Sequence, residues 1–332
     1  MKKLSAIFST VSIITAVSIT PATSIYAVES PNNDAGQALE IAPPVLTLTA
    51  NPGDTVNAQI NLRDISNTPL IVTSAVNDFS AKGEGGEPDI DLEGTEPSPY
   101  SLKPWMQPLP QLNLKSKEIQ KLPVVIKVPQ NAAPGGYWGV VRFTATPPDM
   151  NSTGVSLSAS LGSLIFLRVN GDAKESMEVV DFYASEPGKD KSAGLFEQTP
   201  IDFVLRIKNT GTVHEQPVSQ IRVVDMFGRE AASVNMNLEG RNVLPGSVRK
   251  FTSAMDRGAL GTSTLFGKYT ATITSTFGAS KQTVTKSVEF WVVPYRMIIV
   301  IIVGLILLFF IIRTLLRNYR RKITRSARTS RR

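Results

Sequence analysis

Three acidic side chains at alternate positions could bind a metal ion. Asp89, Asp91 and Glu93 supply carboxylate oxygens, and Gly94 follows them. Such oxygens are the ligands that Ca²⁺ prefers. An EF-hand loop that began at Asp89 would need a bidentate glutamate where this chain has Tyr100. The stretch therefore predicts no EF-hand, and it leaves a looser calcium site and a solvated acidic loop as alternatives.

The usual catalytic side chains are scarce. The chain of 332 residues has no Cys and a single His, His214. This excludes disulfides, thiolate zinc sites, cysteine nucleophiles and a lipid-acceptor cysteine. No G-x-S-x-G elbow and no phosphate-binding glycine loop is present. We therefore expect no enzyme and no cofactor, with a carboxylate pair acting on polysaccharide as the weaker alternative. His214 follows a predicted turn and is expected in a solvent-exposed loop.

Four aromatic side chains could stack on sugar rings and are the candidate ligand-binding residues: Phe79, Trp105, Tyr137 and Trp138. Tyr137 and Trp138 are neighbours in a predicted strand, so one should face the core and the other the surface. Trp105 follows the acidic stretch beside Pro104. Large aromatic residues usually lie inside a protein, so core packing is the alternative for each of them.

The N-terminal residues have the order of a secretory signal peptide. Lys2 and Lys3 precede a weakly apolar stretch, Leu4 to Ile19, and cleavage is expected after Ala27. This order predicts a signal peptide at residues 1–27, with an uncleaved anchor as the alternative. The polar, Pro- and Gly-containing residues 28–42 are predicted to be a flexible leader.

A second apolar segment lies near the C-terminus, with the sequence MIIVIIVGLILLFFII. Such an unbroken run predicts a transmembrane helix over residues 295–316. Trp291 and Tyr295 are placed to form an aromatic belt, and Arg296 and Arg313 can extend their charges to the two interfaces. These four are the predicted membrane-interface residues.

The formal net charge of +7 is concentrated outside the middle of the chain. All 28 acidic residues lie between Glu29 and Glu289. Without Lys2, Lys3, Arg296 and the nine basic residues from Arg313 onward, 23 basic residues remain against those 28. No dense basic patch appears there, so we expect no nucleic-acid partner. The basic tail 317–332 predicts a cytoplasmic C-terminus that lies on anionic lipid.

The region between the two apolar segments is β-rich. Short stretches with alternating apolar residues are separated by Pro- and Gly-containing turns, and helical periodicity is absent. This pattern predicts an all-β chain with two immunoglobulin-like β-sandwich domains, at residues 43–172 and 173–294, followed by the transmembrane helix. The predicted strands include Val45–Thr49, Val56–Leu62, Leu70–Val76, Gln120–Val128, Tyr137–Thr146, Val155–Val169, Ile201–Ile207, Val218–Val224, Val248–Ser253, Tyr269–Thr276 and Thr283–Val293.

The two sandwiches have the pattern of a diverged internal repeat. Strand, asparagine-containing turn and strand recur at 56–79 and at 201–225. The first unit is longer before its later strands, which predicts an insertion between Ser80 and Pro104. Long loops on sandwiches are often functional.

Three motifs of the first unit stand out: the turn Asn51-Pro52-Gly53-Asp54, the stretch Val76-Asn77-Asp78-Phe79 and the run from Val128 to Gly139. They resemble motifs of the WxL-interacting proteins of Gram-positive cell surfaces. The similarity covers residues 43–148 by motif and the rest by architecture. It implies a peptidoglycan-binding first domain, a second domain that binds the host, and a membrane anchor.

The sequence therefore predicts a membrane-anchored cell-surface binding protein. Its first sandwich is expected to engage peptidoglycan or a wall-associated protein, while the span and the basic tail contact lipid. The alternative is a chaperone-like or assembly partner of exported proteins that acts by β-strand augmentation. An exposed edge strand without charges or proline would favour that alternative.

Overall fold

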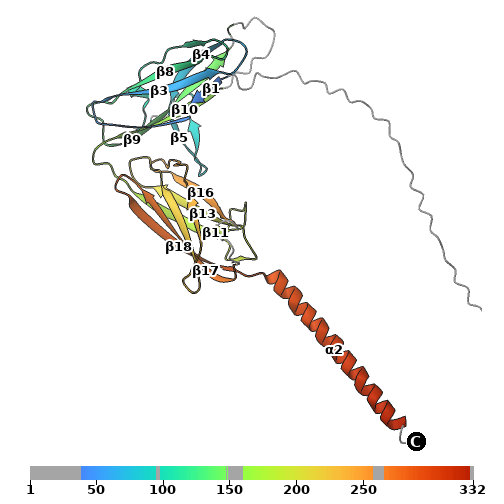
Figure 1. The fold of residues 1–332 in the computed structure, drawn as a ribbon. Coiled ribbons are helices and arrows are strands. Elements are labelled where there is room, and N and C mark those ends of the chain that lie inside the picture. The colour runs from blue at the N-terminus through green and yellow to red at the C-terminus, as the bar shows by residue number, and fades with distance from the viewer. Residues whose placement is uncertain (1–38, 95–97, 147, 149–159, 257–264, 330–332) are drawn as a thin grey trace, which may run out of the picture.

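The computed structural model describes residues 39–94, 98–146, 148, 160–256 and 265–329 (Figure 1). Two β-sandwiches follow one another along the chain, and a long helix leaves the far end of the second (Figure 1). The predicted fold class is therefore confirmed. The predicted signal peptide and most of the predicted leader lie outside the described residues.

The first sandwich is built from a three-stranded sheet, β1-β3-β8, and a five-stranded sheet, β2-β10-β9-β4-β7. A separate hairpin, β5-β6, projects from it. Its strands are β1 (Leu39–Ala42), β2 (Val45–Ala50), β3 (Thr55–Asp64), β4 (Leu70–Asn77), β5 (Phe79–Lys82), β6 (Glu87–Ile90), β7 (Leu112–Leu114), β8 (Ile119–Lys127), β9 (Gly135–Thr146) and β10 (Ser160–Val169).

The second sandwich repeats this strand order with sheets β11-β13-β16 and β12-β18-β17-β14-β15. Its strands are β11 (Met177–Ser185), β12 (Leu195–Phe196), β13 (Ile201–Asn209), β14 (Val218–Asp225), β15 (Glu230–Met236), β16 (Val248–Met255), β17 (Gly267–Phe277) and β18 (Gln282–Val292). Each strand thus has a counterpart in the first sandwich, as expected for an internal repeat.

The hairpin β5-β6 has no counterpart in the second sandwich. It begins at Phe79 and, with the short 3₁₀ helix η2 (Lys103–Trp105), occupies the part of the chain where the insertion was predicted. The inserted residues therefore form a defined element that projects from the first sandwich toward the second (Figure 1).

The first sandwich begins earlier than predicted. Leu39–Ala42, which the sequence predicts to be part of the flexible leader, form β1 and pair with β3. Leu39 is buried in the core of the first sandwich, so the alternation of Leu39 and Ile41 marks a half-buried strand.

Each sandwich has its own apolar core between its two sheets. In the first, the inward side chains include Ile60, Leu122 and Phe143. In the second, Phe203 and Phe290 lie fully buried at the centre. Both sets come from strands with period-two alternation, as two packed sheets require.

The C-terminal helix α2 (Tyr295–Thr329) contains one segment, Tyr295–Arg317, that is long and apolar enough to cross a membrane. The helix continues beyond this segment through the basic tail to Thr329. Trp291 lies near the end of β18, Tyr295 and Arg296 begin α2, and Arg313 lies in the last turns of the apolar segment.

Candidate functional site: a strand edge beside the pocket between the sandwiches

Part of the outer face of the five-stranded sheet in the first sandwich is apolar, although such a face is usually exposed to water. Trp138 on β9 and Phe166 on β10 are register partners on this face. With Phe79, Val140 and Leu244 of the second sandwich they form a separate buried cluster. Both faces of β9 are therefore covered from Gly135 to Val141, which accounts for the apolar sequence of this part of the strand.

The hairpin β5-β6 covers part of this face and reaches the second sandwich. The indole Nε1–H of Trp138 donates to the carbonyl oxygen of Phe79 at 2.8 Å. At the hairpin tip, the Glu84 carboxylate forms an ion pair with Arg206 on β13, and the N–H of Lys250 on β16 donates to the carbonyl oxygen of Glu84 at 2.8 Å. The inserted hairpin thus bridges the two sandwiches.

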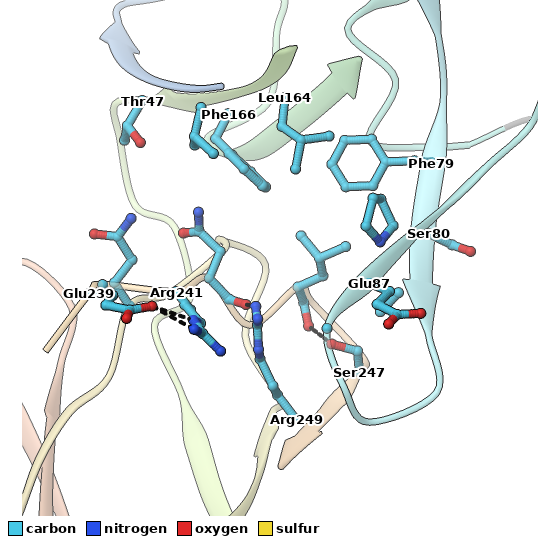
Figure 2. A pocket seen from close by; sticks show the side chains of 18 of the residues that line it. Thr47, Phe79, Ser80, Glu87, Leu164, Phe166, Glu239, Arg241, Ser247 and Arg249 are labelled. Atoms are coloured by element: carbon cyan, nitrogen blue, oxygen red, sulfur yellow. Dashed lines mark hydrogen bonds and ion pairs between the residues drawn. The ribbon is translucent and has the colours of Figure 1, made fainter. Parts of the chain in front are cut away.

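A pocket of about 510 Å³ lies between the hairpin, the outer sheet face and the loop before β16 (Figure 2). This volume is within the range of small-ligand sites, ~300–1,000 Å³. Val45, Thr47, Leu164 and Phe166 line it from the first sandwich, and Arg249 lines it from the second. Arg249 makes no ion pair within the described part of the chain; its guanidinium donates to the carbonyl oxygen of Asn242 and lies over the Phe251 ring.

The strand β2 forms one rim of this pocket and is the edge of its sheet. It pairs in parallel with β10: the carbonyl oxygen of Pro44 accepts from the Leu164 N–H at 2.9 Å, and that of Ala50 accepts from the Asn170 N–H at 2.8 Å. In a parallel pair, alternate residues bond to the same neighbour. Val45, Thr47 and Thr49 therefore direct their N–H and C=O groups away from β10, and no described residue bonds to them.

The other described edges are blunted in ways that proteins commonly use against further pairing. The edge of β8 contains Pro123 and is contacted by Met106. The edge of β11 has a bulge, and that of β16 is contacted by the hairpin tip. Among the described edge strands longer than three residues, β2 is the one without a charge, a proline or a bulge.

The four predicted ligand-binding aromatics divide between two places. Phe79 and Trp138 are buried in the cluster between the sandwiches, so they present no free ring face. Trp105 and Tyr137 are half-buried and pack on each other, with ring centroids 4.2 Å apart. A continuous aromatic platform built from all four is therefore not formed.

The predicted calcium residues do not converge. Asp89 lies in β6 opposite Ser80, Asp91 Oδ1 accepts from the Gly94 N–H at 2.8 Å, and Glu93 is exposed. Within the described residues, no group of three or more His, Cys, Asp or Glu side chains could hold a metal ion. The geometry gives the looser calcium site no support.

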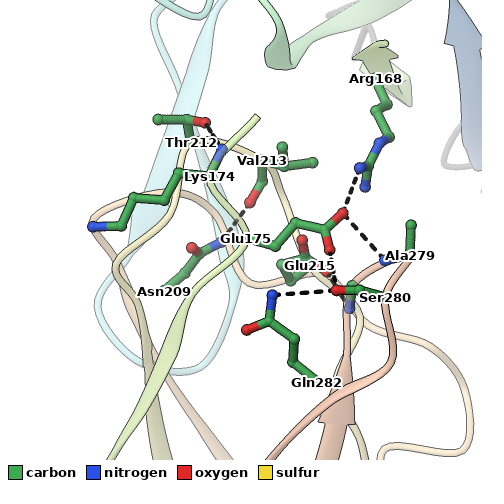
Figure 3. A network of polar contacts seen from close by, with 11 residues as sticks. Arg168, Lys174, Glu175, Asn209, Thr212, Val213, Glu215, Ala279, Ser280 and Gln282 are labelled. Atoms are coloured by element: carbon green, nitrogen blue, oxygen red, sulfur yellow. Dashed lines mark hydrogen bonds and ion pairs between the residues drawn. The ribbon is translucent and has the colours of Figure 1, made fainter. Parts of the chain in front are cut away.

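A polar network links β10 of the first sandwich, the segment between β10 and β11, and the turn between β17 and β18 of the second sandwich (Figure 3). Arg168 of β10 forms an ion pair with Glu175, which also accepts from the Ala279 N–H at 3.1 Å. Burial opposes ionisation of Glu175, but hydrogen bonds from Arg168 and Ala279 lower its pKa overall. Next to it, Glu215 accepts from the Gly278 N–H at 2.9 Å.

The prediction that His214 is solvent-exposed is wrong. His214 is buried, its ring centroid lies 5.1 Å from that of Phe166, and the neighbouring Thr212 accepts from the Gly136 N–H. Burial, reinforced by the Arg168 guanidinium, lowers the pKa of His214 to about 4. The turn before His214 can be recognised from the local sequence, but its burial comes from contact with the first sandwich.

Glu215 and His214 have opposite effects on the pH dependence of stability. Burial, and next the Glu175 carboxylate, raise the pKa of Glu215 from 4.5 to about 7. Between these values the folded chain binds more protons at Glu215 than the unfolded chain, so its contribution to stability falls as pH rises. At His214 the unfolded chain binds more protons than the folded chain between pH 4 and 6.5. The contribution of His214 to the stability of the fold therefore rises with pH.

Glu215→Gln is therefore expected to be more stable than the wild type by an amount that depends on pH. The difference should grow from near zero at pH 4.5 to the order of 3 kcal/mol above pH 7, because the variant has no carboxyl to ionise. Urea unfolding of the full chain in detergent micelles at several pH values measures this. Glu178→Gln, at an exposed position of β11, is the matched control; a pH-independent difference for Glu215→Gln would contradict the prediction.

No protein-family model matches the chain, and no curated protein matches it in sequence. Similar solved structures include the class 5 fimbriae chaperone CfaA, with 12% identity and a TM-score of 0.40 over 75% of this chain and 98% of that chain. The YadV chaperone has 11% identity and a TM-score of 0.36 over 76% and 100%. The complex of the Salmonella enterica SafA pilin with the SafB chaperone has 13% identity and a TM-score of 0.36 over 76% and 96%.

Proposed function

We propose that the protein binds an extended segment of another exported protein by β-strand addition along β2. The observation that carries the proposal is the outer edge of β2, where Val45, Thr47 and Thr49 direct outward backbone groups that no described residue pairs with. Strand addition uses such main-chain groups for affinity and adjacent pockets for the choice of side chains.

The pocket supports this proposal because it lies on the correct face of β2. Thr47 and Phe166 are register partners, so their side chains lie on the same face of the sheet and both line the pocket. A residue paired with Thr47 on an added strand would project onto that face as well. The apolar side chains of Leu164 and Phe166 in this wall favour a partner segment with an apolar side chain at this position.

We further propose that α2 anchors the protein in the cell membrane, with both sandwiches outside and the C-terminus in the cytoplasm. The basic residues that follow the apolar segment support this orientation. The partner would then be a secreted or wall-associated protein, and the protein would act by binding rather than by catalysis.

Thr47→Pro is expected to abolish capture of a partner strand while the chain stays folded. The proline removes an N–H that bonds to no residue in the described part of the chain, and it places its ring on the outer edge of β2. Thr47→Val keeps the N–H and the branched shape, so it is the matched control and should retain capture.

The measurement uses a photo-cross-linking residue at Thr49 of the full chain in producing cells. A discrete partner should be cross-linked in the wild type and in Thr47→Val but lost in Thr47→Pro, and the amides of Val45 and Thr47 should gain protection from hydrogen exchange on binding. Equal capture by Thr47→Pro and Thr47→Val, at equal melting temperatures, would refute strand addition at β2.

Peptidoglycan binding by the first sandwich is a second candidate function. The observation in its favour is the half-buried pair of Trp105 and Tyr137, which retains partly exposed rings. Retention of the full chain on protein-free peptidoglycan, lost in Trp105→Ala, would support it. Flow-through of the wild type would leave strand addition as the function.

A further inference from the structure

Large apolar side chains are exposed at the end of the second sandwich from which α2 leaves. Phe227 is 73% exposed and Phe266 is 63% exposed. Leu195, Met226 and Trp291 at this end are each about half exposed. Single exposed apolar residues are common on protein surfaces, but a cluster of this kind marks an interaction site.

The strand register brings these side chains together. Leu195 on β12 pairs with Trp291 on β18. Phe266 directly precedes Gly267, which pairs with Val292, and its N–H donates to the Tyr269 hydroxyl at 3.0 Å.

The turn between β14 and β15 completes the cluster. Asp225 pairs with Tyr269, and Met226 lies so close to Gly267 that a Cβ there would clash with it. Phe227 comes next in the same turn. We call Leu195, Met226, Phe227, Phe266 and Trp291 the end patch.

The connection to α2 fixes the end patch close to the membrane. Two residues, Val293 and Pro294, separate the end of β18 from the start of α2 at Tyr295. The Val293 N–H donates to the carbonyl oxygen of Phe196 at 2.8 Å, which keeps this connection against β12. At ~3.5 Å per extended residue, α2 begins within ~10 Å of the last paired residue of the sheet.

The charges at this end are compatible with a lipid surface. Asp225 is paired with Arg229 at 2.8 Å, Glu197 with Arg296 at 3.2 Å and Glu289 with Lys268 at 2.7 Å. Arg229 also lies over the Phe227 ring, 5.2 Å from its centroid. Each of these carboxylates already has a cationic partner, so a bilayer surface would not meet an isolated acidic group.

We propose that the end patch docks on the outer surface of the same bilayer that α2 spans, with Phe227 and Phe266 inserted among the lipid headgroups. The headgroup region adds ~5–7 Å to each side of the hydrocarbon core, and aromatic side chains are favoured at that depth. The second sandwich is then held against the membrane at two places, the connection to α2 and the turn around Phe227. This inference rests on the proposed span.

The test uses single-cysteine variants, because the chain has no native Cys. Spin labels are placed on the full chain through Phe227→Cys, Phe266→Cys, Val218→Cys and Val303→Cys, and each chain is reconstituted in phosphatidylcholine–phosphatidylglycerol vesicles. Val218 is exposed at the opposite end of β14, and Val303 lies inside the apolar segment of α2. Accessibility of each label to a water-soluble nickel complex is then measured.

We expect labels at Phe227 and Phe266 to show severalfold lower nickel accessibility than the label at Val218, and the label at Val303 to be shielded almost completely. Labels at Phe227 and Phe266 as accessible as that at Val218, with Val303 shielded, would overturn docking and leave the anchor in place. An accessible label at Val303 would overturn the span and docking together.

A second measurement keeps both phenylalanines in place. A label at Leu195→Cys is expected to be shielded in the otherwise native chain and to lose that shielding in the Phe227→Ser/Phe266→Ser background. Shielding that is equal in both backgrounds would show that the connection to α2 alone holds this end near the lipid, and would overturn the role of the two phenylalanines.

Discussion

Phe290→Ala is expected to destabilise the second sandwich by about 3–5 kcal/mol, the usual cost of removing a fully buried phenylalanine side chain. Phe290 has no solvent exposure and is surrounded by aromatic rings. The ring centroids of Phe196, Phe203 and Tyr269 lie 5.7 Å, 5.8 Å and 5.8 Å from its own. These rings come from β12 and β17 of one sheet and from β13 of the other. The cavity left by Phe290→Ala would therefore lie between the two sheets.

The loss should be confined to one sandwich, because each has its own core. Hydrogen exchange read by mass spectrometry on the full chain in detergent micelles can follow peptides of each sandwich separately. We expect faster exchange throughout β13, β17 and β18 in Phe290→Ala, with β3 and β8 nearly unchanged.

The matched control is Phe227→Ala, which removes the same side chain from an exposed turn of the same sandwich. It should leave exchange in the core strands unchanged. Equal acceleration in both sandwiches for Phe290→Ala would contradict the separate cores and indicate a single cooperative unit.

The long central strands could be predicted from the sequence because their alternation is a local signal. Strands β3, β4, β8 and β13 lie where the pattern placed them. The short outer strands β1, β7 and β12 have two to four residues, too few for a period of two to stand out. Their positions depend on pairing with residues far away in the sequence.

The site was less predictable because its parts come from both sandwiches. The sequence indicates that Val45–Thr49 is a strand, but its position at a free edge follows from the strand order. His214 and Trp138 are buried because the other sandwich or the hairpin covers them. The absence of charged residues in β2 is the one local signal of the site. It indicates a binding edge only once the strand order shows that β2 lies at the edge of its sheet.

Trp138→Ala is expected to loosen the contact between the two sandwiches. Trp138 is buried, donates to the carbonyl oxygen of Phe79 and stacks on Tyr100 with ring centroids 4.6 Å apart. Its removal costs about 3–5 kcal/mol by the same reasoning as for other large buried rings. Most of that loss should appear at the hairpin, because Phe79 begins β5 and Glu84 at its tip pairs with Arg206.

The distance between two spin labels measures this loosening, with labels at Asn57→Cys on β3 and Lys208→Cys on β13, both exposed. We expect a narrow distribution in the native background and a broad one in Trp138→Ala. Trp105→Ala is the matched control, since it removes the same residue type from the first sandwich away from the second. A distribution that stays narrow in Trp138→Ala would mean that the network around Glu175 suffices to hold the sandwiches together.

Trp138→Ala and Thr47→Pro together separate the two parts of the proposed site. Thr47→Pro should abolish strand capture and leave the distance distribution narrow, because it changes the edge of β2 alone. Trp138→Ala should widen the distribution and weaken capture, because it displaces the hairpin that forms one wall of the pocket beside Thr47. Full capture by a Trp138→Ala chain with a widened distribution would show that the edge of β2 binds without the pocket, and the apolar preference proposed for the partner segment would then have no structural basis.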